Sequence, residues 1–176
     1  MTSASAGEYR AVMSGFASGV AIVATAHGEQ AWGMAATSIM SISTASPTVA
    51  VSLFSTGATC RAIAGTNRLS VNFLGEGEEW LSRAFSKPER EAYCAEILLN
   101  ADRVNGVPVD LGAHGYLVCR VTESVVASDH TIMIAKVEAC RAGRDLTAPL
   151  IRHSSAYGCF AVRQPTSEYQ TLTKED

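Results

Sequence analysis

The sequence predicts a mainly β protein with peripheral helices, built as a split antiparallel β-barrel. Its 176 residues suit a single domain, and its 47% of hydrophobic residues suffice for a packed core. About six or seven apolar runs of strand length are separated by turn residues, with only about two or three short helical patterns among them. The sequence lacks the regular strand–helix alternation of a doubly wound sheet, and a barrel would leave few exposed strand edges.

The N-terminal segment is predicted to form a helix, because Ser5 followed three residues later by Glu8 is a capping-box pattern. Gly19 is expected to end this helix. Its apolar positions recur at helical spacing and are Tyr9, Val12, Met13 and Phe16.

The first half of the chain then predicts three extended segments and a second helix. An apolar run over residues 19–26 indicates a buried strand that ends in a turn at 27–29, and residues 32–38 form a second extended run. Residues 41–43 lead into Pro47, and residues 48–54 predict the next strand. A short helix is expected over 58–64, with Gly65 just past its end.

The second half of the chain is dominated by two long alternating strands. A strand over 69–74 and a helix over 78–85 come first, and residues 86–108 are expected to form a helix plus a loop. The runs 114–126 and 131–141 alternate between apolar and polar residues and are predicted to be antiparallel partners. One or two strands over 149–162 complete a domain that ends at residue 163, followed by a polar tail over 164–176.

Composition and charge exclude several classes of protein. Lys and Arg total 14 while Asp and Glu total 17, so the net charge of −3 shows no basic excess of the kind that nucleic-acid binders carry. No apolar run approaches the ~20 residues of a membrane helix, and the N-terminus lacks the pattern of a secretory signal. We therefore expect a cytoplasmic protein with neither nucleic acid nor a membrane as partner.

The cysteines and histidines do not form a metal-binding pattern. The five cysteines have long, irregular spacings without a C-x-x-C pair, which favours reduced thiols. Cys119, Cys140 and Cys159 lie in apolar strand-like runs, where buried thiols act as small hydrophobic groups. The four histidines lack the spacing of metal ligands. The glycines form neither a dinucleotide-binding nor a P-loop motif.

Residues 33–43 are rich in small side chains and hydroxyls. A planar heteroaromatic ligand needs small residues beneath its ring and hydroxyl or backbone donors at its edge. Thr37, Ser38 and Ser41 are candidates for those donors. A polar edge strand followed by a serine-rich loop would explain the same composition.

Residues 52–59 combine a strand end, a hydroxyl-rich turn and a helix start. The N–H groups of a helix N-terminus together with nearby hydroxyls form a phosphate site, to which Arg61 could add charge. Ordinary helix capping by Ser55 or Thr56 is the alternative.

Two shorter segments carry further polar candidates. Residues 84–87 place an aromatic ring, a hydroxyl and a cation together, which suits a cofactor edge or phosphate but also a helix C-terminus. Asp129 beside His130 can fix a tautomer or hold a positive charge, although Ser128 and Asp129 also suit a β-turn. No G-x-S-x-G motif accompanies them, so no serine hydrolase is indicated.

The order of these segments resembles the short-chain flavin reductase family, the reductase components of two-component flavin monooxygenases. The resemblance runs from about Tyr9 to Phe160. The matching residues are Tyr9-Arg10, Met13, Phe16 to Val23, Gly33-Met34, Thr37-Ser38, Ser41, Ser43, Pro47, Val49 to Leu53, Ser70 to Leu74, Leu81, Phe85-Ser86, Asp129-His130, Pro149 to Ile151 and Tyr157.

The resemblance implies a fold of the FMN-binding split-barrel type, a homodimer, and hydride transfer from NADH or NADPH to FMN or FAD. Reduced flavin would then pass to a partner monooxygenase. The implied site residues are Met34, Ala36, Thr37 and Ser38 at the isoalloxazine ring, Ser52, Ser55 and Thr59 at the flavin phosphate, Phe85, Ser86 and Lys87 closing the cofactor site, and His130 and Tyr157 at the nicotinamide nucleotide. No catalytic acid or base is obligatory, so His130 would orient its ligand.

This chain departs from the family pattern in two regions. In the phosphate-side loop, the Asn often seen in the family is replaced around Phe54 and Ser55. Ser128 stands where the family commonly has Gly, and Ala135 and Lys136 stand near positions where it has Gly and Glu. The choices between FMN and FAD and between NADH and NADPH stay open. Two alternatives also stay open: a flavin carrier or sensor without turnover, and a flavoprotein that keeps its flavin tightly bound and reduces another acceptor.

Overall fold

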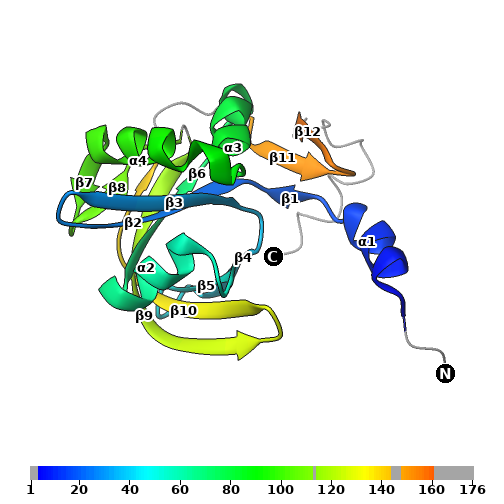
Figure 1. Cartoon of the computed structure of the whole chain (residues 1–176), viewed down its shortest axis with the longest axis horizontal. Helices are drawn as coiled ribbons and strands as arrows, with labels where there is room; N and C mark the ends of the chain where they lie inside the picture. The colour runs from blue at the N-terminus through cyan, green and yellow to red at the C-terminus, as the bar shows by residue number, and fades with distance from the viewer. Residues whose placement is uncertain (1–3, 113, 144–147, 161–176) are drawn as a thin grey trace, which may run out of the picture.

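A computed structural model of the chain describes residues 4–112, 114–143 and 148–160. Its body is a seven-stranded antiparallel sheet with the strand order β3-β2-β6-β9-β10-β5-β4 (Figure 1). The strands of this sheet are β2 (Ala21–His27), β3 (Gln30–Ala36), β4 (Ile39–Ser43), β5 (Thr48–Phe54), β6 (Arg68–Phe73), β9 (Gly115–Ala127) and β10 (His130–Ala142). The described fold is therefore mainly β with antiparallel sheets.

Two small sheets and four helices surround this body (Figure 1). The small sheets are β1-β11-β12, from β1 (Ser18–Gly19), β11 (Leu150–His153) and β12 (Ala156–Cys159), and β7-β8, from β7 (Asp102–Val104) and β8 (Val107–Val109). The helices are α1 (Ala6–Ser14), α2 (Ala58–Thr66), α3 (Glu79–Phe85) and α4 (Glu91–Asn100), with 3₁₀ turns η1 (Glu76–Glu78) and η2 (Pro88–Arg90).

The seven-stranded sheet curls around one hydrophobic cluster. Val23 near one end of the sheet and Val51 near the other belong to the same buried cluster, together with Ile63 of α2. The two outermost strands, β3 and β4, follow one another in the chain and are separated only by Thr37 and Ser38. In the described structure no pairing joins them, so the sheet curls without closing at this point.

A second cluster lies on the opposite face of β2 and β3, where α3 and α4 cover the sheet. Ile22 packs there with Phe85 and Leu98. Gly33 makes this close approach possible, because a Cβ atom at that position would lie 3.0 Å from side-chain carbons of both Phe85 and Leu98.

Most of the expected elements are present, and the capping box is confirmed by the Ser5 hydroxyl accepting from the Glu8 N–H while the Glu8 carboxylate accepts from the Ser5 N–H. Both expected glycine stops were wrong. The first helix ends at Ser14, and Gly19 lies in β1. The second helix runs through Gly65 and ends at Thr66, and its C-cap residue Asn67 adopts a left-handed φ of 51°.

Three further expectations need correction. Strand β4 was expected only as a run toward Pro47. Residues 86–108 were expected to form a helix plus a loop, but the β7-β8 hairpin begins within this segment, at Asp102. All five cysteines are free, but Cys140 and Cys159 are exposed. Cys119 is buried, and this burial raises the pKa of its thiol to about 12. The expected domain end at 163 and the tail over 164–176 lie outside the described residues.

The described helices include none that combines the length and the apolar character needed to cross a bilayer. Within the described chain, no three His, Cys, Asp or Glu side chains gather where they could hold a metal ion.

Candidate functional site

A groove of about 460 Å³ follows the outer edge of β3. Its lining comprises β3 from Ala31 to Ala35, the start of α2, residues 85–88 and one side of α4. In the described sheet β3 pairs only with β2, so its other edge presents backbone donors and acceptors. Since α2 belongs to the interior cluster and α4 to the outer one, the groove lies between the two faces of the sheet.

One part of this groove is built to attract an anion. Helix α2 begins at Ala58 with Gly57 as its N-cap residue, and no side chain caps it. Gly57, Ala58 and Thr59 line the groove, so the positive end of the helix dipole lies at its wall. Lys87 lines the same cavity. These groups suit a phosphate.

A second cavity, of about 400 Å³, shares Ala35, Ser86 and Lys87 with the groove. Tyr157 lines it, and the hydroxyl of this residue lies 2.8 Å from the Ser82 hydroxyl and accepts a 3.2 Å hydrogen bond from Arg152. The guanidinium carbons of Arg83 and Arg152 lie 5.0 and 5.3 Å from the centre of the Tyr157 ring. This cavity therefore joins an aromatic ring to cationic groups.

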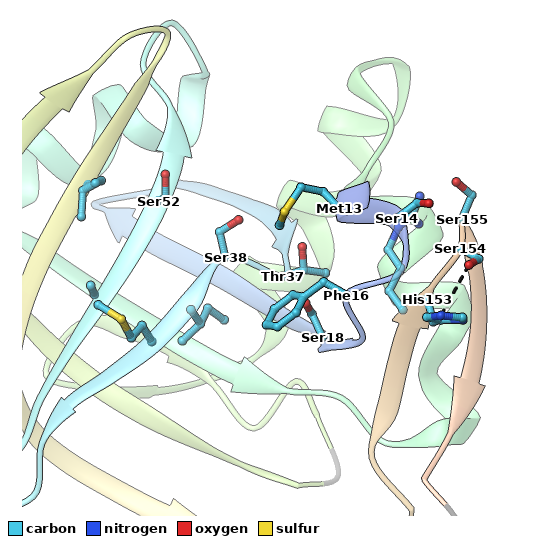
Figure 2. Close-up of a pocket in the computed structure, with 15 residues that line it drawn as sticks. Met13, Ser14, Phe16, Ser18, Thr37, Ser38, Ser52, His153, Ser154 and Ser155 are labelled. Carbon is cyan, nitrogen blue, oxygen red and sulfur yellow. Dashed lines mark hydrogen bonds between the residues drawn. The ribbon is translucent and has the colours of Figure 1, made fainter. Parts of the chain in front are cut away.

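A third cavity, of about 650 Å³, lies beside the β3–β4 junction. Figure 2 shows the hydroxyls of Thr37, Ser38 and Ser52 along it, with Met13 and Phe16 between Ser38 and the turn of β11 and β12. Thr37 and Arg152 line both this cavity and the second one, so the second cavity adjoins both the groove and the third cavity. The Ser52 N–H donates to the Ser38 carbonyl at 3.0 Å, which ties the start of β4 to β5.

His130 stands at the start of β10, beside the third cavity. It alternates with Ile132, which lines that cavity, so both side chains lie on the same face of the sheet. Its ring meets Phe54 edge to face at 5.7 Å between centroids. Its Nδ1 lies 2.7 Å from an Asp129 carboxylate oxygen, and this hydrogen bond lowers the pKa of Asp129. The Asp129 contact holds the imidazole in one orientation.

The structure brings most of the predicted site residues together, in three groups. Met34, Thr59, Phe85, Ser86 and Lys87 line the groove, while Ala36, Thr37, Ser86, Lys87 and Tyr157 line the second cavity, and Thr37, Ser38 and Ser52 line the third.

Two predicted residues lie outside these linings. Ser55 forms a 2.9 Å hydrogen bond with the Thr131 hydroxyl, and His130 contacts Phe54 and Asp129. His130 and Tyr157, expected at the same nucleotide, therefore stand apart. Arg61 turns away from the groove and donates to the Thr56 carbonyl.

The sequence reasoning missed Trp32, Arg83 and Arg152, which line these cavities. Arg152 lies in the segment that leads to Tyr157, directly after the apolar residues Leu150 and Ile151 of β11. The departure at Ser128 also has a structural consequence, because this residue adopts a φ of 56° in the turn before β10. A glycine would adopt that conformation without strain.

Comparisons with known proteins point to one class of enzyme. The family described as flavin reductase like domain matches residues 13–160. The NADH:FMN oxidoreductase of Rhodococcus qingshengii is 29% identical over 155 residues, which cover 86% of this chain and 80% of that protein.

Two further proteins that are similar to this chain are also flavin reductases or reductase components of monooxygenases. The reductase component of 4-hydroxyphenylacetate 3-monooxygenase from Thermus thermophilus is 31% identical over 149 residues, covering 85% of this chain and 93% of that protein. The solved structure of the styrene monooxygenase flavin reductase from Pseudomonas putida is 31% identical and superposes with a TM-score of 0.75, covering 89% of this chain and 99% of that one.

Proposed function

This chain belongs to the flavin reductase like domain family, and we propose that its β3-edge groove and the adjoining cavities are where it transfers a hydride from NADH or NADPH to FMN or FAD. It is an NAD(P)H-dependent flavin reductase that supplies reduced flavin to a monooxygenase component, the role named for its relatives. One observation supports the assignment of this groove above all others. Small residues on the unpaired edge of β3 and the uncapped N-terminus of α2 line the same groove.

The residues of the groove fit a flavin. Small side chains along β3 leave room for a planar ring, and Thr37 and Ser38 supply hydroxyls at its far end. Met34 and Ala36 complete the proposed ring site. Because Thr59 and Lys87 flank the start of α2, the flavin phosphate belongs there.

The family resemblance implied three residues at the flavin phosphate, and the geometry supports only one of them, Thr59. Ser52 lines the third cavity, and the Ser55 hydroxyl is hydrogen-bonded to the Thr131 hydroxyl. Neither residue lines the groove that Thr59 lines. Phe85 and Ser86 line the groove wall beside Lys87, which supports their proposed role in closing the site.

The nicotinamide nucleotide is assigned to the cavities beyond the ring site. The bound pair supplies hydride transfer between nicotinamide C4 and flavin N5. Tyr157 and Arg152 would hold the nucleotide, and His130 would orient it from the end of β10. The task of these residues is to keep the two rings at near-attack distance, about 3–3.5 Å, and to exclude water.

The sheet order supports the split-barrel type as the finer fold assignment. We assign the split-barrel type because the curled sheet opens between β3 and β4, where Thr37 and Ser38 line two of the cavities. The proposed domain covers residues 1–163, with 164–176 as a tail. A cytoplasmic location agrees with five free thiols, which reducing compartments favour.

A homodimer is supported by an apolar surface beside the site. On the outer face of the sheet, Met40 of β4 pairs with Ala50 of β5, and Ala50 pairs in turn with Ile134 of β10. Ser52 of β5 pairs with Ile132 of β10. Met40 remains 60% exposed in one copy of the chain. A second copy of the chain would cover this face and narrow the third cavity.

The test is oxidation of NADH and of NADPH by the purified protein with FMN, FAD or no added flavin. The proposal expects turnover that rises with added flavin and saturates. The same assay shows whether NADH or NADPH is the better donor and whether FMN or FAD is the better acceptor. Flavin binding without turnover would instead indicate a carrier or sensor. A protein that stays yellow through dialysis and needs no added flavin would indicate a tightly bound prosthetic group.

A further inference from the structure

Ser82 is a buried polar residue at the second cavity to which the proposed reaction gives no part. It lies in the middle of α3 and is only 1% exposed. Its hydroxyl reaches across to another element, since it lies 2.8 Å from the hydroxyl of Tyr157, 75 residues further along the chain. A buried hydroxyl costs free energy unless it is hydrogen-bonded, and the contact with Tyr157 offsets that cost.

The contact differs from the usual behaviour of a serine in a helix. Such a serine commonly donates to a carbonyl one turn back in its own helix. Ser86, at the end of α3, does this, because its hydroxyl donates to the Ser82 carbonyl at 2.7 Å. The hydroxyl of Ser82 joins two elements of the fold instead of two turns of one helix.

Tyr157 lies on a strand at the margin of the fold. Its strand, β12, pairs only with β11 in the described sheets. Helix α3 lies beside this small sheet (Figure 1) and is anchored in the outer hydrophobic cluster by Leu81 and Phe85. The bond from Ser82 therefore ties a marginal strand to a helix that is packed on the body of the protein.

Consecutive residues of α3 contact the two parts of the Tyr157 side chain. Ser82 meets the hydroxyl, and the guanidinium of Arg83 lies over the ring. Arg83 is itself held within α3, since its Nε donates to a Glu79 carboxylate oxygen at 2.5 Å. A guanidinium can only donate, so the phenolic oxygen accepts from Arg152, and its remaining hydrogen-bonding capacity is directed at Ser82.

We propose that Ser82 is a positioning residue of the reductase site. It holds the Tyr157 hydroxyl, and through it the Arg152 guanidinium, at the wall of the second cavity. This inference rests on the proposed function, because Tyr157 and Arg152 are assigned there to the nicotinamide nucleotide. Ser82 is buried and acts on the donor through Tyr157.

The first test is kinetic. Ser82→Ala should raise the KM for the nicotinamide donor about fivefold, the effect expected for one hydrogen bond. The kcat and the flavin dissociation constant should change less than about twofold. Alanine is a good helix former, so the variant should fold, and Ser124→Ala on an exposed part of β9 is the control. An unchanged KM for the donor would overturn the proposal, and so would an equal loss of flavin binding.

The second test asks whether Ser82 acts through Tyr157. In a Tyr157→Phe background, Ser82→Ala should change the KM for the donor less than about twofold, because the phenol that it positions is already absent. The full fivefold effect in that background would show that Ser82 acts independently of Tyr157 and would overturn the proposal.

A spectroscopic test needs no turnover. The chain has five tyrosines, and ¹³C labels at their Cζ atoms report on each phenol by NMR. Tyr157→Phe identifies the signal of Tyr157. Ser82→Ala should shift that signal and leave the other four unchanged. A Tyr157 signal that does not move would overturn the proposed contact.

These outcomes distinguish the failure of this inference from the failure of the proposed function. Wild-type turnover with a donor KM that is indifferent to Ser82→Ala would retain the proposed function and overturn only the role of Ser82. Wild-type protein without turnover for any pair of donor and flavin would refute the proposed function and, with it, the role of Ser82 in donor binding.

Discussion

The two ends of the seven-stranded sheet are covered in different ways. At the β3 end, α2 lies on one face and α3 and α4 lie on the other (Figure 1). At the β4 end, no described helix makes an extensive contact with β4, β5 or β10. Phe54, opposite His130 on the outer face there, is 46% exposed.

This difference separates what one copy of the chain completes from what it leaves open. The covered end forms a groove from a single copy, and this groove includes the uncapped N-terminus of α2. The bare end exposes apolar side chains beside the residues assigned to the nicotinamide nucleotide. Helix α1 is also unpartnered, since it buries no residue and Val12 on it is 76% exposed. A second copy of the chain would cover both the bare end of the sheet and the apolar side chains of α1.

The largest expected effect concerns the covered end. Leu98 of α4 is fully buried against the outer face of β2 and β3. Leu98→Ala should reduce the free energy of unfolding by about 2–5 kcal/mol, because it removes apolar contacts and leaves a cavity. Urea unfolding measures this. Leu99→Ala, at a position 40% exposed, is the matched control and should cost less than about 0.5 kcal/mol. Equal losses would mean that α4 does not hold the groove wall.

The next prediction tests the bare end. Met40→Glu should weaken the proposed homodimer by about 2–5 kcal/mol, because dimer formation would bury an uncompensated charge. Sedimentation equilibrium should show a folded monomer. Gln30→Glu, on the exposed part of the opposite edge strand, should leave association unchanged. A wild-type protein that is monomeric at every concentration would contradict this use of the bare face.

The third prediction separates the flavin site from the nicotinamide site. Lys87→Ala should raise the KM for flavin about tenfold or more, because a charged hydrogen bond to phosphate contributes about 1.5–3 kcal/mol. The KM for NADH should stay within about twofold. Arg103→Ala, which removes an exposed cation from β7, is the control. If Lys87→Ala left the KM for flavin unchanged, the assignment of the flavin phosphate to this groove would be wrong.

The fourth prediction is its counterpart at the bare end. His130→Ala should raise the KM for the nicotinamide nucleotide by about fivefold, since one hydrogen bond or ring contact contributes about 1 kcal/mol. The flavin dissociation constant, measured by fluorescence, should change less. Equal weakening of both ligands would show that His130 does not act on the nicotinamide nucleotide alone.

The smallest expected effect is confined to α1. Ser5→Ala removes a helix cap that contributes about 1 kcal/mol to the helix, but α1 buries no residue, so global unfolding of the monomer should hardly change. Amide exchange should rise only in α1. A global loss of stability in monomeric protein would show that α1 packs on its own body.

The same cap makes α1 sensitive to acid. Hydrogen bonds from Ser5 lower the pKa of Glu8 from its usual 4.5. The stabilisation is therefore present above pH 4.5 and is lost as the pH falls through the lower, folded-state pKa. Chemical shifts of α1 amides followed during acid titration measure this.

Local patterns in the sequence predicted local structure well. The Ser5–Glu8 capping box and the antiparallel pair β9 and β10 depend on spacing alone, and both are present. The β7-β8 hairpin was missed although its signal was available. Asn105 and Gly106 are a favoured two-residue turn, and both adopt positive φ, at 51° and 85°.

The candidate site was harder to predict because it depends on tertiary placement. Ser52, Ser55 and Thr59 are close in sequence, yet one lies on a strand face, one in a turn and one in a helix, and they point to different surroundings. Trp32 and Arg152 carry no local motif. Trp32 lies on β3 of the seven-stranded sheet and Arg152 on β11 of a small sheet, and tertiary packing brings each to a cavity that predicted residues also line.

The sheet order also sets the sequence of events in folding. The hairpins β2-β3, β4-β5 and β9-β10 join strands that are neighbours in the chain, whereas β5 and β10 pair residues 48–54 with residues 130–136. Such non-local pairing slows folding, because a long loop must close before its contacts form. We expect β5 and β10 to pair late in refolding. The face that carries His130 should therefore be recovered after the local hairpin that forms the floor of the flavin groove.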